Sequence, residues 1–281
     1  MAAQPPLKLL MLHGYTQSGP LFHAKSRALT KHITKAFPRH EVSAIYPTGP
    51  LRLNPADIPG YTPQEGSSTA DSKEAEIEAY GWYRRSNTAE PPLYVGLEDG
   101  LDAIAKVLSE EGPFDGVIGF SQGAAMAAMV ASLLEEKRQG AFANFPSAST
   151  SSDVEVFAYP ASFAKLNHPA LKFAMCYSGF RSPGDRYRAF YESPPIQTPI
   201  LHVLGSLDAV VEESRSRSLI EACVGDPEAE GKVVWHPGGH FLPSQRPYLD
   251  AAVRFIRECL EGGAQKDQAK DEDVNDMDLP F

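Results

Sequence analysis

Residues 119–123, Gly-Phe-Ser-Gln-Gly, constrain the fold of this chain more than any other stretch. The apolar run at residues 117–120 predicts a buried strand, and the alanine-rich residues after Gly123 predict a helix. A serine between glycines at such a junction indicates a sharp turn that lifts its hydroxyl above the end of a sheet. Gly119 and Gly123 leave room where a Cβ would collide with the crossing strand and helix. We therefore predict that Ser121 is a nucleophile, the alternative being a buried serine at a helix N-terminus.

A candidate acid and a candidate base follow Ser121 along the chain. Asp208 comes just after an apolar run at residues 200–205, and His240 lies in a glycine-bearing loop after a second run at 233–236. Catalytic groups collect beyond the carboxyl ends of parallel strands. A serine hydroxyl needs a base that takes its proton, and that base needs an anion that holds its tautomer. The sequence therefore predicts that Ser121, Asp208 and His240 are the catalytic residues.

The acid and the base both have rivals in the sequence. Asp185 and Asp226 are alternatives to Asp208, but neither directly follows a convincing strand. His236 competes with His240; because it ends the predicted strand and a rigid proline follows it, we expect it to be structural. The histidines show no H-E-x-x-H or comparable spacing, so we expect no metal site.

Four stretches together resemble the FSH-type family of serine hydrolases, a eukaryotic family within the α/β-hydrolase superfamily. They are the turn at 119–123, Gly-Ser-Leu-Asp-Ala-Val-Val at 205–211, Pro-Gly-Gly-His-Phe at 237–241 and Leu-His-Gly-Tyr-Thr-Gln-Ser-Gly at 12–19. The resemblance covers most of residues 7–260, with further matches at 46–50 and Trp82. It implies a single-domain hydrolase of acyl esters or thioesters that needs neither a metal nor an organic cofactor. Some fungal members release polyketide acyl chains from synthases.

The loop after the first predicted strand is expected to complete the site. In hydrolases of this architecture, a backbone N–H of that loop and the N–H of the residue after the nucleophile form the oxyanion hole. These donors would be Tyr15 and Gln122, with Thr16 as the alternative to Tyr15. We also expect Trp82 and Phe241 to contact the substrate.

Strands and helices are expected to alternate along the chain. Apolar runs without clean alternation predict parallel strands that are buried on both faces. The expected strands are residues 7–12, 42–46, 117–120, 171–177, 200–205 and 233–236. We therefore expect an α/β-hydrolase fold: a mostly parallel, doubly wound sheet of about six strands, with helices on both faces and a cap formed by insertions.

The chain is expected to hold one domain, at residues 1–261, followed by a disordered acidic tail at 262–281. Stretches near 57–88 and 138–163 contain runs rich in Pro, Gly, Ser and Thr, which indicate exposed insertions. We expect both insertions to form a cap over Ser121. Their aromatic side chains would suit an acyl chain, or would pack the cap against the core.

Composition excludes several kinds of partner. The 281 residues carry a net charge of −10, which argues against nucleic acid or an anionic membrane surface as the main partner. No run approaches the ~18 apolar residues that indicate a membrane span. The cysteines at 176, 223 and 259 are odd in number and widely spaced, so we expect reduced thiols and a cytoplasmic location. The oligomeric state is not predicted.

The combined expectation is a serine carboxylesterase or thioesterase that works through an acyl-enzyme intermediate. Its partner would be a small acyl ester or thioester. One alternative is a thioesterase that releases an acyl chain from a carrier domain or synthase, although an acidic surface would not favour an acidic carrier. A second alternative is a catalytically silent binding scaffold on the same fold.

Overall fold

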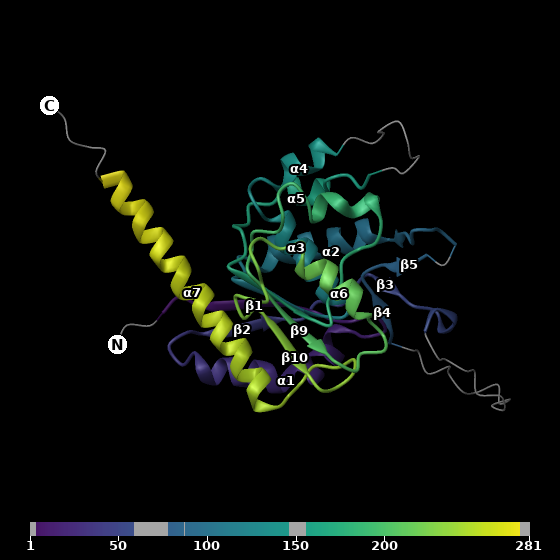
Figure 1. Cartoon of the computed structure of the whole chain (residues 1–281), viewed down its shortest axis with the longest axis horizontal. Helices are drawn as coiled ribbons and strands as arrows, with labels where there is room; N and C mark the ends of the chain where they lie inside the picture. Colours follow the sequence, from purple (N-terminus) through teal and green to yellow (C-terminus); the bar gives the residue numbers. More distant parts are fainter. Residues whose placement is uncertain (1–3, 59–77, 87, 146–155, 276–281) are drawn as a thin grey trace.

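A six-stranded parallel sheet forms the centre of the computed structural model, which describes residues 4–58, 78–86, 88–145 and 156–275 (Figure 1). The strand order is β10-β9-β8-β7-β1-β2, and every pair of neighbours is parallel. The strands are β1 (Leu7–Leu12), β2 (Val42–Ile45), β7 (Gly116–Phe120), β8 (Phe173–Tyr177), β9 (Ile200–Gly205) and β10 (Val233–His236). All six lie where the apolar runs predicted them, and their carboxyl ends share one edge of the sheet.

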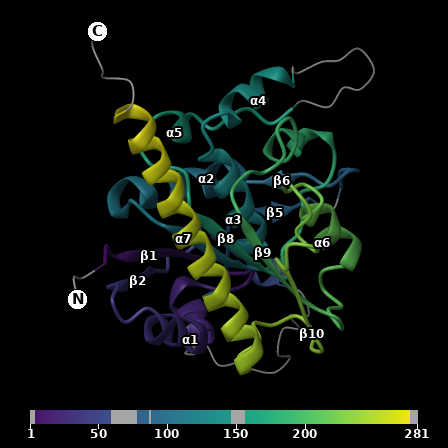
Figure 2. The ribbon, with the colours of Figure 1, turned by 60° about the vertical axis from the view of Figure 1, so that its left-hand side comes forward.

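Helices cover both faces of the sheet, as expected for a doubly wound fold (Figures 1 and 2). One face packs against α1 (Gly19–Ala36) and α7 (Arg246–Asn275), which also contact each other. The other face packs against α2 (Leu97–Glu111), α3 (Gln122–Leu133) and α6 (Glu213–Ile220). Successive strand residues alternate between the two cores, so Leu9 and Met11 face α1 while Leu10 and Leu12 face α3.

The helix α3 is buried along its whole length, which explains why its sequence is alanine-rich and not amphipathic. Small side chains let it lie close to the sheet, and the Cys176 thiol of β8 contacts the Ala124 carbonyl at 3.3 Å. This close approach fixes the position of the first turn of α3, directly after Ser121.

Two short antiparallel ribbons lie beside the main sheet. They pair β3 (Leu51–Arg52) with β4 (Tyr80–Gly81), and β5 (Arg84–Arg85) with β6 (Tyr94–Val95). The helical turn η1 (Pro55–Asp57) follows β3. The stretch from 59 to 77 and residue 87 lie outside the described residues, so the expectation that 57–88 forms a cap stays a prediction.

The described parts of the second insertion include contacts with the far end of α3, and because residues 146–155 lie outside the described residues, the expectation that 138–163 forms a cap stays a prediction. The helix α4 (Arg138–Asn144) follows the end of α3, and Arg138 donates hydrogen bonds to the carbonyls of Ala189 and Pro194, which precede β9. The Tyr159 hydroxyl donates to the Leu133 carbonyl, also at the end of α3. A helix that packs on such a sheet runs back toward the amino ends of the strands. The helix α4 and Tyr159 therefore lie near the end of α3 that is distant from Ser121.

The helix α7 extends further than the sequence indicated. Its backbone continues to Asn275, so residues 262–275 are helical here although we expected no regular structure there. Residues 276–281 lie outside the described part, and the expectation of a disordered tail stays a prediction. Among the described helices, none is long and apolar enough to span a membrane.

Candidate active site

Ser121 occupies a strained turn between β7 and α3. Its φ is 53° and its ψ is −117°, a backbone conformation that few residues other than glycine adopt. A Cβ at Gly119 would lie 2.1 Å from the carbonyl oxygen of Gly123, and a Cβ at Gly123 would lie 2.1 Å from that of Leu12. Both flanking glycines are therefore required by backbone contacts, as the sequence predicted.

The structure brings Ser121, His240 and Asp208 together at the carboxyl edge of the sheet. The His240 Nε2 atom lies 2.9 Å from the Ser121 Oγ atom. The His240 Nδ1 atom lies 2.8 Å from Oδ2 of Asp208. The three side chains come from the ends of β7, β10 and β9, so strand order places them at one point although the chain separates them widely.

The environment of Asp208 keeps its carboxylate ionised. Partial burial alone would raise the pKa of Asp208, but hydrogen bonds from the Val211 N–H, from His240 and from the Val210 N–H lower it below its usual value. Both backbone bonds measure 2.9 Å and end on Oδ1. An ionised Asp208 accepts a hydrogen bond from the Nδ1–H group of His240. That tautomer leaves Nε2 as the acceptor facing Ser121.

Hydrogen bonds in the loop after β1 distinguish the two candidates for the second oxyanion donor, Tyr15 and Thr16. The Thr16 N–H donates to the Tyr80 carbonyl at 2.9 Å, so it is already engaged. The N–H groups of Tyr15 and Gln122 make no hydrogen bond with any described residue. Tyr15, Thr16 and Ser121 line the same cavity. This geometry favours Tyr15 over Thr16.

A buried histidine braces that loop. His13 donates from Nδ1 to the Gly14 carbonyl at 2.8 Å, and its Nε2 atom accepts from the Gly49 N–H at 2.8 Å. Burial lowers the pKa of His13 to about 4, against a weaker opposing effect of the bond to Gly14. The ring is therefore neutral at neutral pH, and both of its nitrogen atoms hold backbone.

Trp82 lies behind the loop and not on the wall of the cavity where we expected it. It is fully buried, and its indole N–H donates to the His13 carbonyl at 2.9 Å. Its backbone N–H donates to the side-chain oxygen of Gln122 at 2.8 Å, while the Gln122 amide nitrogen donates to the Tyr83 carbonyl at 2.8 Å. The Gln122 side chain therefore holds the backbone of residues 82 and 83 beside the site. The sequence did not indicate this contact, because only the backbone N–H of Gln122 was considered.

A cavity of about 570 Å³ opens beside Ser121. Its apolar lining includes Ile58, Val210 and Phe241, and Lys25 of α1 contributes a charge. Phe241 therefore lies where the sequence placed it, and Ile58 is the described contribution of the first insertion. The volume is typical of pockets that bind small organic molecules.

No group of three His, Cys, Asp or Glu side chains within the described ranges is placed to hold a metal ion. The groups gathered at this site are a strained serine, an imidazole, a carboxylate and free backbone N–H groups.

A parallel sheet with helices on both faces, and a strained serine that meets a histidine and an aspartate from later loops, define an α/β-hydrolase. The sequence model of the family "Serine hydrolase (FSH1)" matches residues 1–252, and the chain belongs to this family. The resemblance found in the sequence is thereby confirmed.

An esterase relative and a solved thioesterase structure agree with this class. The chain is 32% identical over 264 residues to esterase OVCA2 of Danio rerio, a match that covers 89% of this chain and 98% of the relative. It is also 32% identical over 251 residues to a Schizosaccharomyces pombe protein named dihydrofolate reductase, but there it spans only 47% of the relative's length. Acyl-protein thioesterase 2 of Zea mays shares the fold, with a TM-score of 0.55 at 20% identity over 92% of this chain and 95% of that one.

Proposed function

We propose that this serine hydrolase cleaves acyl esters or thioesters, with Ser121 as nucleophile, His240 as general base and Asp208 as the anion behind it. His240 takes the hydroxyl proton as the Ser121 Oγ atom attacks the carbonyl carbon. The alcohol or thiol leaves with that proton. Water, activated by the same imidazole, then releases the acid from the acyl-enzyme.

The hydrogen-bond chain from Ser121 through His240 to Asp208 is the observation that carries this proposal. Its two links of 2.9 and 2.8 Å lie within the range for general-base catalysis. The lowered pKa of Asp208 supports the same direction of proton transfer, because a carboxylate stabilises the imidazolium that forms.

The free N–H groups of Tyr15 and Gln122 are proposed to hold the oxyanion. Both belong to residues at the cavity or beside Ser121, and neither has another partner among the described residues. Donors aimed at the developing charge commonly lower the barrier by about 3–4 kcal/mol each. The apolar lining around Val210 and Phe241 suits the hydrocarbon part of an acyl group.

Labelling with a fluorophosphonate probe tests the assignment directly. We expect one adduct, on Ser121, located by mass spectrometry of the labelled peptide, and none in Ser121→Ala. Ser178→Ala is a matched control, because Ser178 also follows a strand and also has a positive φ, of 50°. It should label like the wild type. Folded protein without an adduct at Ser121 would favour the silent binding scaffold.

A further inference from the structure

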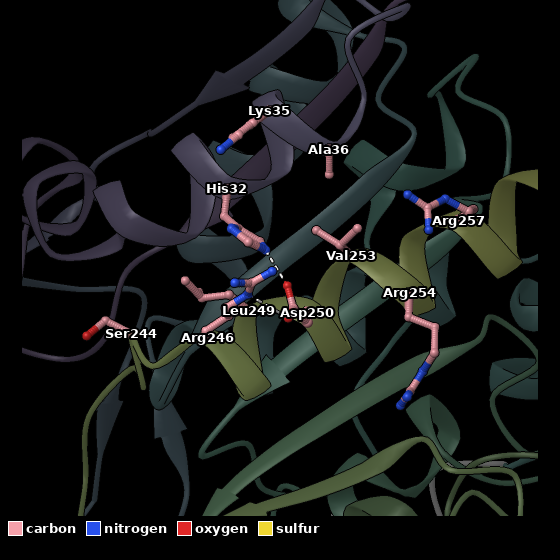
Figure 3. Close-up of a pocket in the computed structure, with 10 residues that line it drawn as sticks. All are labelled: His32, Lys35, Ala36, Ser244, Arg246, Leu249, Asp250, Val253, Arg254 and Arg257. Carbon is pink, nitrogen blue, oxygen red and sulfur yellow. Dashed lines mark hydrogen bonds and ion pairs between the residues drawn. The ribbon is translucent and has the colours of Figure 1, made fainter.

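A second hollow of about 670 Å³ lies between the second half of α1 and the first half of α7 (Figure 3). None of the residues that line it also lines the cavity beside Ser121. Among the described residues that line it, four are cationic, Lys35, Arg246, Arg254 and Arg257, and one is acidic, Asp250; His32 also lines it. We call this hollow the α1–α7 groove.

Two of the four Lys or Arg side chains of the groove pair with carboxylates, Arg246 with Asp250 and Arg254 with Glu258 at 3.9 Å, and the other two do not. Asp250 is shared, since one oxygen lies 2.8 Å from His32 Nε2 and the other 3.4 Å from Arg246 Nε. Lys35 and Arg257 form no ion pair with any described residue, and the Arg257 guanidinium lies over the Phe37 ring at 5.7 Å. Two unpaired cations on two different helices therefore border one hollow.

This local charge is opposite to that of the molecule as a whole. The lining holds four Lys or Arg residues against one Asp, whereas the chain carries a net charge of −10. Cations gathered around a hollow focus a positive potential and raise the local concentration of anions. Arginine forms paired hydrogen bonds with phosphate oxygens. The groove is therefore suited to a small ligand with phosphate groups.

Two segments of the chain run from the cavity beside Ser121 to the groove. Lys25 lines the cavity beside Ser121, and His32 lines the groove seven residues later on the same face of α1, about 10 Å along the helix axis. Leu242 lines the cavity and Ser244 lines the groove, only two residues apart. A substrate whose carbonyl lies at Ser121 can thus reach the groove with a long, flexible arm.

We infer that the α1–α7 groove binds the phosphate groups at the far end of the leaving group of a long-armed acyl thioester. This inference rests on the proposed function. The shared ligand chemistry is phosphate on a pantetheine arm, with or without an attached nucleotide. In the reaction, Ser121 Oγ bonds to the acyl carbon as the C–S bond breaks, and the thiolate takes the proton from His240. The phosphates stay unchanged and serve only to bind.

Three hexanoyl thioesters test the inference: those of pantetheine, phosphopantetheine and coenzyme A, which share the reacting carbonyl and differ in phosphate and, for coenzyme A, also in the nucleotide. We expect KM to fall from pantetheine to coenzyme A while kcat stays similar. The step at which KM falls shows which phosphates the groove binds. Lys35→Glu and Arg257→Glu should each shrink the ratio of the KM for the pantetheine thioester to the KM for the coenzyme A thioester. The expected decrease is about two- to five-fold, the size of a screened ion pair. Added salt should shrink the ratio too.

Lys31→Glu is the matched control for Lys35→Glu, because Lys31 is exposed on the same helix and does not line the groove. The two substitutions change the net charge equally. Lys31→Glu should keep the wild-type ratio. Equal KM values for the pantetheine and coenzyme A thioesters in the wild type would overturn the inference. An equal effect of Lys31→Glu and Lys35→Glu would also overturn it, since long-range charge would then suffice. Melting temperatures exclude unfolding of the variants.

Failure of the proposed function is recognised separately. The neutral ester p-nitrophenyl hexanoate has no phosphate to bind in the groove. Its hydrolysis by the wild type therefore tests the proposed function without the groove. Calorimetric binding of free coenzyme A to Ser121→Ala reports on the groove without catalysis, and Lys35→Glu in that background should weaken it. Binding that Lys35→Glu leaves unchanged would contradict the groove even if every ester is hydrolysed.

Discussion

The indole N–H of Trp82 donates a hydrogen bond of 2.9 Å to the backbone carbonyl of His13, two residues before the loop residue Tyr15. The backbone of the same tryptophan is held by the side chain of Gln122, directly after Ser121. One buried residue therefore ties together the two segments that would supply the oxyanion donors. Donors fixed before the substrate arrives need no reorganisation during the reaction.

Trp82→Phe tests this bracing, because it keeps an aromatic ring and removes the N–H donor. The His13 carbonyl would lose a buried partner, at a cost of about 1–3 kcal/mol in unfolding free energy. We expect a lower melting temperature and a lower kcat for acetyl and hexanoyl esters alike. Trp235→Phe, at a partly exposed position on β10, is the control. A lower kcat for the hexanoyl ester alone would contradict this bracing role and would indicate that Trp82 contacts the acyl chain.

Substitution of the two neighbouring histidines distinguishes the base. His240→Ala should lower kcat on the order of 10⁴-fold, as removal of a catalytic group does. His236→Ala should be much milder, because within the described ranges His236 accepts only a 3.2 Å bond from the Gly238 N–H, and no bond joins it to Ser121. Steady-state kinetics on a p-nitrophenyl ester measures both. If His236→Ala were the more damaging variant, the base would be His236.

Chain-length preference tests the apolar wall of the cavity. We expect esters with two to four more carbons than acetyl to have kcat/KM about ten-fold higher or more, since each buried methylene contributes up to ~0.8 kcal/mol. Val210→Ala should flatten this preference. Leu207→Ala is the matched control, because Leu207 belongs to the same loop, is 72% exposed and does not line the cavity. An enzyme that prefers acetyl over all longer esters would contradict an acyl pocket.

Stability should fall in acid because two buried histidines resist protonation. Burial lowers the pKa of His13 to about 4 and that of His202 to about 3, from 6.5. Below pH 6.5 the unfolded chain binds protons at these positions and the folded chain does not, so unfolding becomes easier as the pH falls toward 3. Melting temperatures from pH 7 to 4 should therefore drop, and His202→Leu should reduce the drop. An unchanged slope in His202→Leu would show that other groups cause it.

Truncation after Glu261 tests the C-terminal segment. We expect unchanged activity and melting temperature, because residues 262–281 carry many charges and few apolar side chains with which to offset their ordering. Activity on p-nitrophenyl esters and differential scanning calorimetry measure the two effects. A clear fall in melting temperature would show that this segment packs on the body of the protein.

The elements that the sequence predicted are those that rest on local patterns. Apolar runs located the six strands, and chain order together with strand ends placed Ser121, Asp208 and His240 at one edge. Contacts between distant segments carry no such pattern, so the bond from Trp82 to His13 was not foreseen. The position of α4 at the far end of α3 depends on the direction in which α3 runs, which spacing along the chain does not reveal.

The loops that carry Asp208 and His240 also carry part of the wall of the cavity beside Ser121: Val210 is two residues from Asp208, and Phe241 is the neighbour of His240. Loops exchanged between relatives would consequently alter turnover and substrate choice in a single step. Evolution or engineering toward a new acyl group should proceed more readily through single side chains, at positions such as 58, 210 and 241, while the backbone of both loops is conserved.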